Sequence, residues 1–176
     1  MTVITESARA KVNLTLEIVG RRPDGYHELK SLVAFADLAD RLILDSDAGP
    51  AVTVSGPFAG EIAGENLLAA TLRLIAAREP RLRLGAVHLE KAIPVAAGLG
   101  GGSADAAALL RAVRLANPEY AAAVDWPGLA ARLGADVPVC LESRAAWVFG
   151  KGEDVVPLAA QLPTLHAVLV LSLIHI

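Results

Sequence analysis

The chain has 176 residues, of which 54% are hydrophobic and 20% are charged, and its net charge is −3. This length suits one large domain, and the acidic balance argues against non-specific binding to nucleic acid. No uncharged apolar run approaches the roughly 20 residues that span a bilayer, and no signal peptide is visible. The single cysteine, Cys140, excludes an internal disulfide and fits a core position in a reducing compartment. We therefore expect a cytoplasmic protein that is not held in a membrane.

The first predicted element is a strand at residues 7–18, where apolar and polar side chains alternate with the period of a half-buried strand. The apolar positions 10, 12, 14, 16 and 18 are expected to face the core. Lys11 and Asn13 fall on the opposite, polar face. The alternation leaves two interpretations open for this pair, a solvated outer face or two side chains directed into a site.

A turn follows the first strand, because residues 23–25 read Pro-Asp-Gly. Tyr26 and His27 come directly after it. They are either a surface aromatic with a solvated histidine, or a stacking surface beside a hydrogen-bonding group, suited to a nucleobase or another flat ring.

The remaining elements are expected where apolar runs lie between turn signals. Strands are predicted at 31–38, 41–45, 51–55, 84–93, 145–149 and 168–173. Helices are predicted at 67–78, with Asn66 as N-cap, at 103–116, and within 125–134, with Gly134 as the stop. Because Pro138 disfavours a helical conformation at Val137, Asp136 is expected in a turn before a strand. This carboxylate is either a structural cap or part of the chemistry.

The most informative stretch runs from Pro94 to Ala116, where four glycines lie within residues 98–102 and an alanine- and leucine-rich run follows. Ser103 is a favoured N-cap, and Asp105 falls in the first helical turn, where negative charge is favoured. A strand, a glycine loop and a helix N-terminus would direct free N–H groups at one small volume that suits a phosphate. The stretch fits neither the Walker nor the dinucleotide pattern, so alone it predicts either a phosphate loop or a flexible cap.

Four segments together resemble one family: residues 7–14 (Ser-Ala-Arg-Ala-Lys-Val-Asn-Leu), 22–29 (Arg-Pro-Asp-Gly-Tyr-His-Glu-Leu), 94–106 and 133–139 (Leu-Gly-Ala-Asp-Val-Pro-Val). Their order and spacing resemble the 4-diphosphocytidyl-2-C-methyl-D-erythritol kinases of the GHMP kinase superfamily. The resemblance implies the α+β fold of a GHMP kinase N-terminal domain (ribosomal protein S5 domain 2-like), a mixed sheet packed with helices. It also implies ATP-dependent phosphorylation of the 2-hydroxyl of a small cytidine diphosphate sugar alcohol in the non-mevalonate isoprenoid pathway.

The same resemblance implies roles for individual residues. Lys11 matches the family's active-site lysine, and Asp136 matches the catalytic aspartate that accepts the proton of the substrate hydroxyl. Asn13, Tyr26 and His27 match substrate-binding positions, with the Tyr-His pair near the cytosine. Positions near ATP are matched by Asn66, Lys91, Pro94, Val95, Ala96, Ala97, Gly98, Leu99, Gly100, Gly101, Gly102, Ser103 and Ala104. Mg²⁺ is expected to arrive with ATP, since no carboxylate cluster for a dedicated metal site is evident.

Two departures from the family pattern bear on these expectations. The family often has glycine at positions 96 and 97, where this chain has alanine. The family also has a second, C-terminal domain, so residues 1–165 are expected to form the N-terminal ATP-binding domain. Residues 166–176 are expected to begin the next domain or to be a foreign tail, because Leu-Ser-Leu-Ile-His-Ile at 171–176 matches a translated sequencing adapter. Such a chain is expected to bind ATP weakly and not to turn over.

Two alternatives to this function stay open. One is another GHMP kinase, acting on homoserine or a mevalonate derivative, against which the Tyr26-His27 pair argues. The other is a nucleotide-binding module without turnover, against which the presence of both Lys11 and Asp136 argues.

Overall fold

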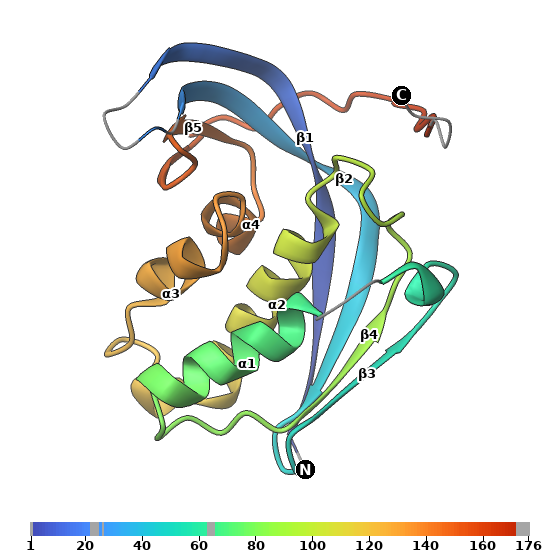
Figure 1. Ribbon diagram of the computed structural model, residues 1–176, viewed down its shortest axis with the longest axis vertical. Helices are drawn as coiled ribbons and strands as arrows, with labels where there is room; N and C mark the ends of the chain where they lie inside the picture. The colour runs from blue at the N-terminus through green and yellow to red at the C-terminus, as the bar shows by residue number, and fades with distance from the viewer. Residues whose placement is uncertain (1, 22–24, 26, 63–65, 172–176) are drawn as a thin grey trace.

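The computed structural model describes residues 2–21, 25, 27–62 and 66–171. A layer of helices covers one face of a mixed sheet (Figure 1). The strands are β1 (Val3–Arg21), β2 (His27–Asp45), β3 (Ala51–Ser55), β4 (Ala86–Glu90), β5 (Ala146–Gly150) and β6 (Asp154–Pro157). The α-helices are α1 (Leu67–Arg78), α2 (Gly101–Ala116), α3 (Trp126–Leu133) and α4 (Val137–Glu142). Single 3-10 turns lie at Ala59–Glu61 and Pro118–Tyr120. This arrangement confirms the predicted α+β class.

Strand β2 is the centre of the sheet. The strand order is β3-β4-β2-β5-β6, and β1 also pairs with β2, antiparallel and along nearly all of its length. On its other edge, β2 pairs with β5 through residues 29–33 and with β4 through residues 41–45. The β3–β4 pair is parallel and the other pairs are antiparallel, so the sheet is mixed as predicted.

The core lies between the sheet and helix α2. Most of α2 is buried, and many of its buried positions are alanine, which lets the helix lie close to β1 and β2. The largest fully buried side chains include Leu42, Leu44 and Leu89 from the sheet and Leu109 and Leu110 from α2. Cys140 belongs to this core as predicted, and burial raises the pKa of its thiol to about 12.

Strand β1 departs from the predicted alternation. Lys11 is buried, whereas Val12, Leu14, Leu16 and Ile18, expected on the core face, are exposed. The register shifts between Arg9 and Lys11 and again between Asn13 and Thr15, and each shift moves the following side chains to the other face. The solvated interpretation of Lys11 is therefore wrong.

Two other strand predictions were wrong for local reasons. The expected break between 31–38 and 41–45 does not occur, because Asp40 is buried in a continuous β2 and its carboxylate accepts hydrogen bonds there. Helix α4 replaces the strand expected after Asp136, because Pro138 lies in the first helical turn, where a missing N–H costs little.

The chain beyond β5 also differs from expectation. Strand β6 was not predicted, because residues 150–154 indicated only a turn. No regular element is assigned within 158–171, so the predicted strand at 168–173 is absent over its described part. Residues 172–176, most of the segment interpreted as a foreign tail, lie outside the described residues.

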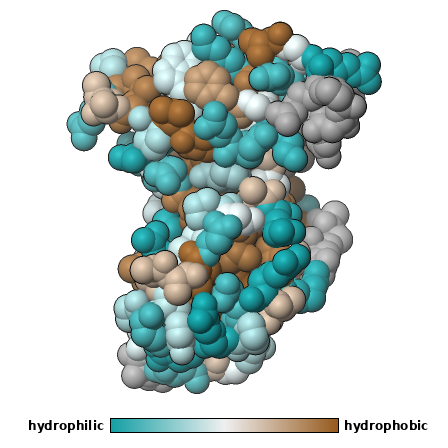
Figure 2. Space-filling view, turned by 90° about the vertical axis from the view of Figure 1, so that its left-hand side faces the viewer, coloured by the Kyte–Doolittle hydropathy of each residue, from teal (hydrophilic) through white to brown (hydrophobic). Residues whose placement is uncertain are grey.

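The molecular surface narrows between an upper and a lower part (Figure 2). Apolar residues lie on the surface of the upper part. The C-terminal half of β1 exposes Leu16, Ile18 and Val19. Among the helices of the described segments, none combines the length and the apolar character that crossing a bilayer requires.

Candidate active site

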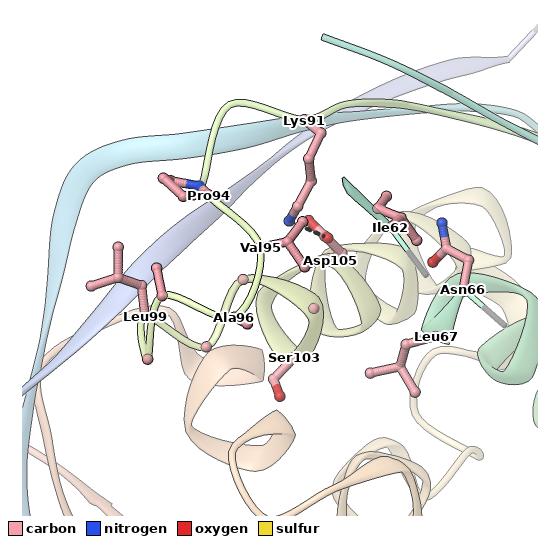
Figure 3. Close-up of a pocket in the computed structure, with 15 residues that line it drawn as sticks. Ile62, Asn66, Leu67, Lys91, Pro94, Val95, Ala96, Leu99, Ser103 and Asp105 are labelled. Atoms are coloured by element: carbon pink, nitrogen blue, oxygen red, sulfur yellow. Dashed lines mark hydrogen bonds and ion pairs between the residues drawn. The ribbon is translucent and has the colours of Figure 1, made fainter. Parts of the chain in front are cut away.

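A pocket of about 340 Å³ lies between the loop of residues 94–100, the N-terminus of α2 and the start of α1 (Figure 3). Asn66 and Leu67 approach it from the side opposite the loop. The lining residues are Ile62, Asn66, Leu67, Lys91, the whole run from Pro94 to Ser103, and Asp105. The structure therefore gathers the predicted ATP-binding residues around one pocket. The exception is Ala104, which is buried inside α2.

The loop presents the first turn of α2 to this pocket. Helix α2 begins at Gly101, and its N-cap is Gly100 in the left-handed conformation, so the prediction of Ser103 as N-cap was wrong. Within the described residues no side chain caps α2. Its first N–H groups therefore remain available to an anion, and the helix dipole favours negative charge at the same place.

The backbone of the loop is strained at Ala96. Its φ of 57° lies in the left-handed region, which costs a non-glycine residue about 1–2 kcal/mol. Glycine would adopt this conformation without that cost. The strain lies in the loop that lines the pocket, where strained backbone is often functional.

Gly100 brings the loop against β1. A Cβ atom at this position would lie 2.7 Å from Cγ of Lys11. The Lys11 amide also donates to the Leu99 carbonyl at 2.9 Å. The absence of a side chain at Gly100 therefore lets the loop rest directly on the lysine.

We expect Gly100→Ala to lower the free energy of unfolding by about 1–2 kcal/mol, because alanine is strained at a φ of 65° and meets Lys11. Gly102→Ala is the matched control, since a Cβ at Gly102 meets nothing within 4 Å. Because alanine has a higher helix propensity than glycine, Gly102→Ala should raise the free energy of unfolding by up to about 1 kcal/mol. Urea unfolding of the two variants measures the difference, and equal effects would contradict the close approach.

Lys11 holds Asp136 at the edge of the loop. Its Nζ donates to Oδ1 of Asp136 at 2.9 Å and to Oδ1 of Asn13 at 3.0 Å. Nδ2 of Asn13 in turn donates to the Ser31 hydroxyl at 2.6 Å. The Lys11 side chain is 9% exposed, whereas that of Asp136 is 43% exposed and stays open to a bound molecule. The three residues predicted from opposite ends of the chain, Lys11, Asn13 and Asp136, thus lie together.

Arg111, which the sequence did not single out, joins the elements that carry this pair. From α2, its guanidinium donates to the carboxylate of Glu6 at 2.7 Å and to the carbonyl of Ser7 at 2.9 Å, both on β1. It also donates to the carbonyl of Cys140 on α4 at 2.8 Å. An arginine within an alanine-rich helix gave no sequence signal for this role, because its partners are distant in the chain.

Lys91 does not offer a free charge to the pocket. Its Nζ donates to Oδ2 of Asp40 at 2.5 Å and to Oδ2 of Asp105 at 2.8 Å (Figure 3 shows the second contact). Burial opposes the charged form of Lys91, but the two carboxylates outweigh it and raise the pKa of the lysine. Asp105 is buried and does not serve as an exposed charge at the helix terminus. No sequence pattern indicated that Asp40 would be buried beside Lys91.

Asp105 makes the stability of the chain depend on pH. Burial, with the neighbouring Asp40 charge, raises the pKa of its carboxyl from 3.8 to about 7, against the opposing effect of Lys91. The folded state therefore binds more protons than the unfolded state between about pH 4 and pH 7. Its free energy of unfolding should fall as pH rises through this window, by up to about 1.4 kcal/mol per pH unit.

Urea unfolding of the wild-type and Asp105→Asn chains at about pH 5 and about pH 7.5 measures this effect. The stability of the variant relative to wild type should improve at the higher pH, because asparagine carries no charge to bury. A difference that stays constant between the two pH values would contradict the elevated pKa.

Of the predicted cytosine-binding pair, only His27 is described by the structure, and it lies away from the pocket. Tyr26 is outside the described residues. His27 begins β2 and is exposed. Six residues separate it from Val33, the partner of Asn13, which is about 20 Å along a strand. The structure thus does not bring His27 to Lys11 and Asp136, but places it further along the same ribbon.

Comparisons with known proteins agree with this geometry. The family model of the GHMP kinases N terminal domain matches residues 66–144. The 4-diphosphocytidyl-2-C-methyl-D-erythritol kinase of Rhodopseudomonas palustris (strain BisB5) is 54% identical over 175 residues, covering 97% of this chain and 58% of the relative. The protein of the same name from Methylobacterium radiotolerans is 53% identical over 175 residues, covering 97% of this chain and 59% of that relative.

A solved structure of 4-(cytidine 5'-diphospho)-2C-methyl-D-erythritol kinase matches with a TM-score of 0.65 and 46% identity, over 89% of this chain and 55% of that one. The chain thus spans somewhat more than half the length of the relatives it matches. The chain thus has the fold of a GHMP kinase N-terminal domain, and its sequence is similar to the N-terminal portion of the 4-diphosphocytidyl-2-C-methyl-D-erythritol kinases.

Proposed function

We propose that this chain supplies the ATP-binding domain of a kinase that phosphorylates the 2-hydroxyl of 4-diphosphocytidyl-2-C-methyl-D-erythritol in the non-mevalonate isoprenoid pathway. The observation that carries the proposal is the Lys11–Asp136 pair, at 2.9 Å, beside a glycine loop. The loop is held to the same lysine by the hydrogen bond from the Lys11 amide to Leu99. Lys11 therefore contacts both the loop proposed to bind phosphate and the carboxylate proposed as the base.

In this reaction the loop and the first turn of α2 bind the phosphates of ATP through backbone N–H groups. Asn66, at the opposite side of the pocket, contacts the base. Mg²⁺ carried with ATP would neutralise phosphate charge during transfer. The pocket fits such a complex, because its loop offers amide donors to the phosphates, and we assign no residue of this chain to the ion. The single, buried Cys140 fits the reducing cytoplasm, where we place the reaction.

Asp136 accepts the proton of the attacking hydroxyl, and Lys11 places a positive charge next to that oxygen. Asn13 fixes the position of the lysine, since its amide oxygen accepts from Nζ while its nitrogen is tied to Ser31. Tyr26 and His27 bind the cytosine, and His27 lies where β2 begins, paired with Arg21 at the end of β1. The distance of about 20 Å along β2 between His27 and Val33 fits a long acceptor with a base at one end and a hydroxyl at the other.

A phosphorylation assay tests this function. Because the chain covers 58% of the Rhodopseudomonas palustris relative, the assay uses a chimera of residues 1–165 with the remaining C-terminal part of that relative. We expect ADP release that depends on the cytidine substrate and is not supported by homoserine or mevalonate. Release with homoserine or mevalonate alone would identify a different GHMP kinase. ATP binding without any release would favour a nucleotide-binding module.

A further inference from the structure

The buried cluster of Asp40, Lys91 and Asp105 spans the two ends of the phosphate loop. Before the loop, the amides of Ala92 and Ile93 donate to Oδ1 of Asp40 at 2.6 and 2.7 Å. After the loop, Asp105 on α2 accepts from Nζ of Lys91, which also donates to Asp40. The cluster therefore fixes both ends of residues 94–100 to the middle of β2.

The same cluster lies directly beneath the start of α2. A Cβ atom at Gly101, the first residue of the helix, would lie 3.0 Å from Nζ of Lys91. The side chains of all three members are at least 95% buried. Lys91 and Asp105 line the pocket, pointing toward each other behind the loop (Figure 3). A change of charge in the cluster therefore acts on the groups that would hold a phosphate.

The charges of this cluster do not balance. Two carboxylates and one ammonium leave a net charge of −1 when all three are ionised. Oδ1 of Asp105 is buried, and no hydrogen-bond partner for it lies among the described residues. A buried negative charge without full compensation is costly, and a bound polyphosphate would raise that cost by repulsion.

We propose that Asp40 and Asp105 position the phosphate loop through Lys91, and that binding of a nucleoside triphosphate at the loop is accompanied by uptake of a proton on Asp105. The proton removes the excess negative charge and leaves a neutral Asp105 beside the Lys91–Asp40 ion pair. This inference rests on the proposed nucleotide site.

The charged groups around Asp105 support this assignment. Lys91, which follows β4, and Asp40 on β2 are the groups that act on its ionisation. On β1 and α4, the charged groups of the site are Lys11 and Asp136, which pair with each other at 2.9 Å, so their two charges compensate. On the α1 side, the pocket is lined by the uncharged Asn66 and Leu67. Because burial and Asp40 raise the pKa of Asp105 to about 7, a proton can be gained there near neutral pH.

Isothermal titration calorimetry of the 176-residue chain with ATP and excess Mg²⁺ tests the proposal. Titrations at pH 7 in PIPES and in imidazole, which differ in ionisation enthalpy, give the number of protons taken up. We expect up to about half a proton per ATP, because Asp105 is roughly half protonated before binding at this pH. The dissociation constant should rise above pH 7 by up to about tenfold per pH unit.

Asp105→Asn keeps an oxygen for Lys91 and removes the titrating group, so it should abolish the uptake and flatten the pH dependence of affinity. Asp37→Asn is the matched control, since Asp37 lies on β2 near Asp40 but its side chain is fully exposed, and it should leave the uptake unchanged. Asp40→Ala should weaken ATP binding at every pH, because it releases the amides of Ala92 and Ile93.

ATP binding without proton uptake in the wild-type chain would overturn the inference while leaving the proposed function intact, and this measurement needs no variant. Uptake that persists in Asp105→Asn would also overturn it, by assigning the proton to another group. Absence of ATP binding in either buffer would instead remove the nucleotide site, and the proposed function with it.

Discussion

Asp136→Asn should lower the turnover of the chimera of residues 1–165 and the Rhodopseudomonas palustris C-terminal part by about 10²–10⁴-fold, the loss typical of removing a general base. Asparagine keeps an oxygen to accept from Nζ of Lys11, so the contact at 2.9 Å and the local structure should persist. Only the ability to take a proton is lost. Steady-state kinetics should therefore show a fall in kcat with little change in KM for ATP.

Glu142→Gln provides the matched control for this variant. Glu142 ends the same helix, α4, and its side chain is 42% exposed and pairs only at 3.5 Å with Arg144. Its replacement should leave kcat within about twofold, because exposed ion pairs contribute little. Wild-type turnover in Asp136→Asn would show that another group accepts the proton, and the role proposed for the Lys11–Asp136 pair would be wrong.

The helices that hold the pocket could be predicted because their signals are local. Helix α1 begins and ends at the predicted residues, and Asn66 caps it by accepting from the Leu68 amide at 2.9 Å. The end of α2 at Ala116 was predicted in the same way. The predicted start of α2, Ser103, was two residues too late. Gly100, in the left-handed conformation, is the N-cap, although serine is the more common residue at that position.

The charged interior could not be predicted from local patterns. Asp40 and Lys91 are 51 residues apart, and Lys11 and Asp136 are 125 residues apart. A period-2 pattern assigned Lys11 to a polar face, but the register shift in β1 between Arg9 and Lys11 places it inside the molecule. The family resemblance indicated Lys11 and Asp136 as partners, but it gave no indication that Asp40, Asp105 and Arg111 support the loop and the pair.

Lys91→Met should lower the free energy of unfolding of the chain by more than Gly100→Ala does. Methionine retains an apolar stem of similar length but removes the ammonium that lies between two carboxylates, both at most 5% exposed. Two buried carboxylates would then face each other without a cation, and removing one partner of a buried pair costs about 3–5 kcal/mol. Urea unfolding at pH 7 measures this loss, which should shrink in acid as the carboxyls take up protons.

Two further variants serve as controls. Lys30→Met measures the effect of removing an exposed lysine, and a variant without any charge in the cluster tests whether repulsion between the carboxylates causes the loss. Lys30 is an exposed residue of β2 whose Nζ lies 5.4 Å from the ring centroid of Trp147, so its replacement should cost at most about 1 kcal/mol. The triple variant Asp40→Asn, Lys91→Met, Asp105→Asn removes every charge of the cluster and should be more stable than Lys91→Met alone. Asparagine at position 40 still offers an oxygen to the amides of Ala92 and Ile93, so the loop keeps that attachment. If the triple variant were less stable than Lys91→Met, repulsion between the carboxylates would not be the cause of the loss.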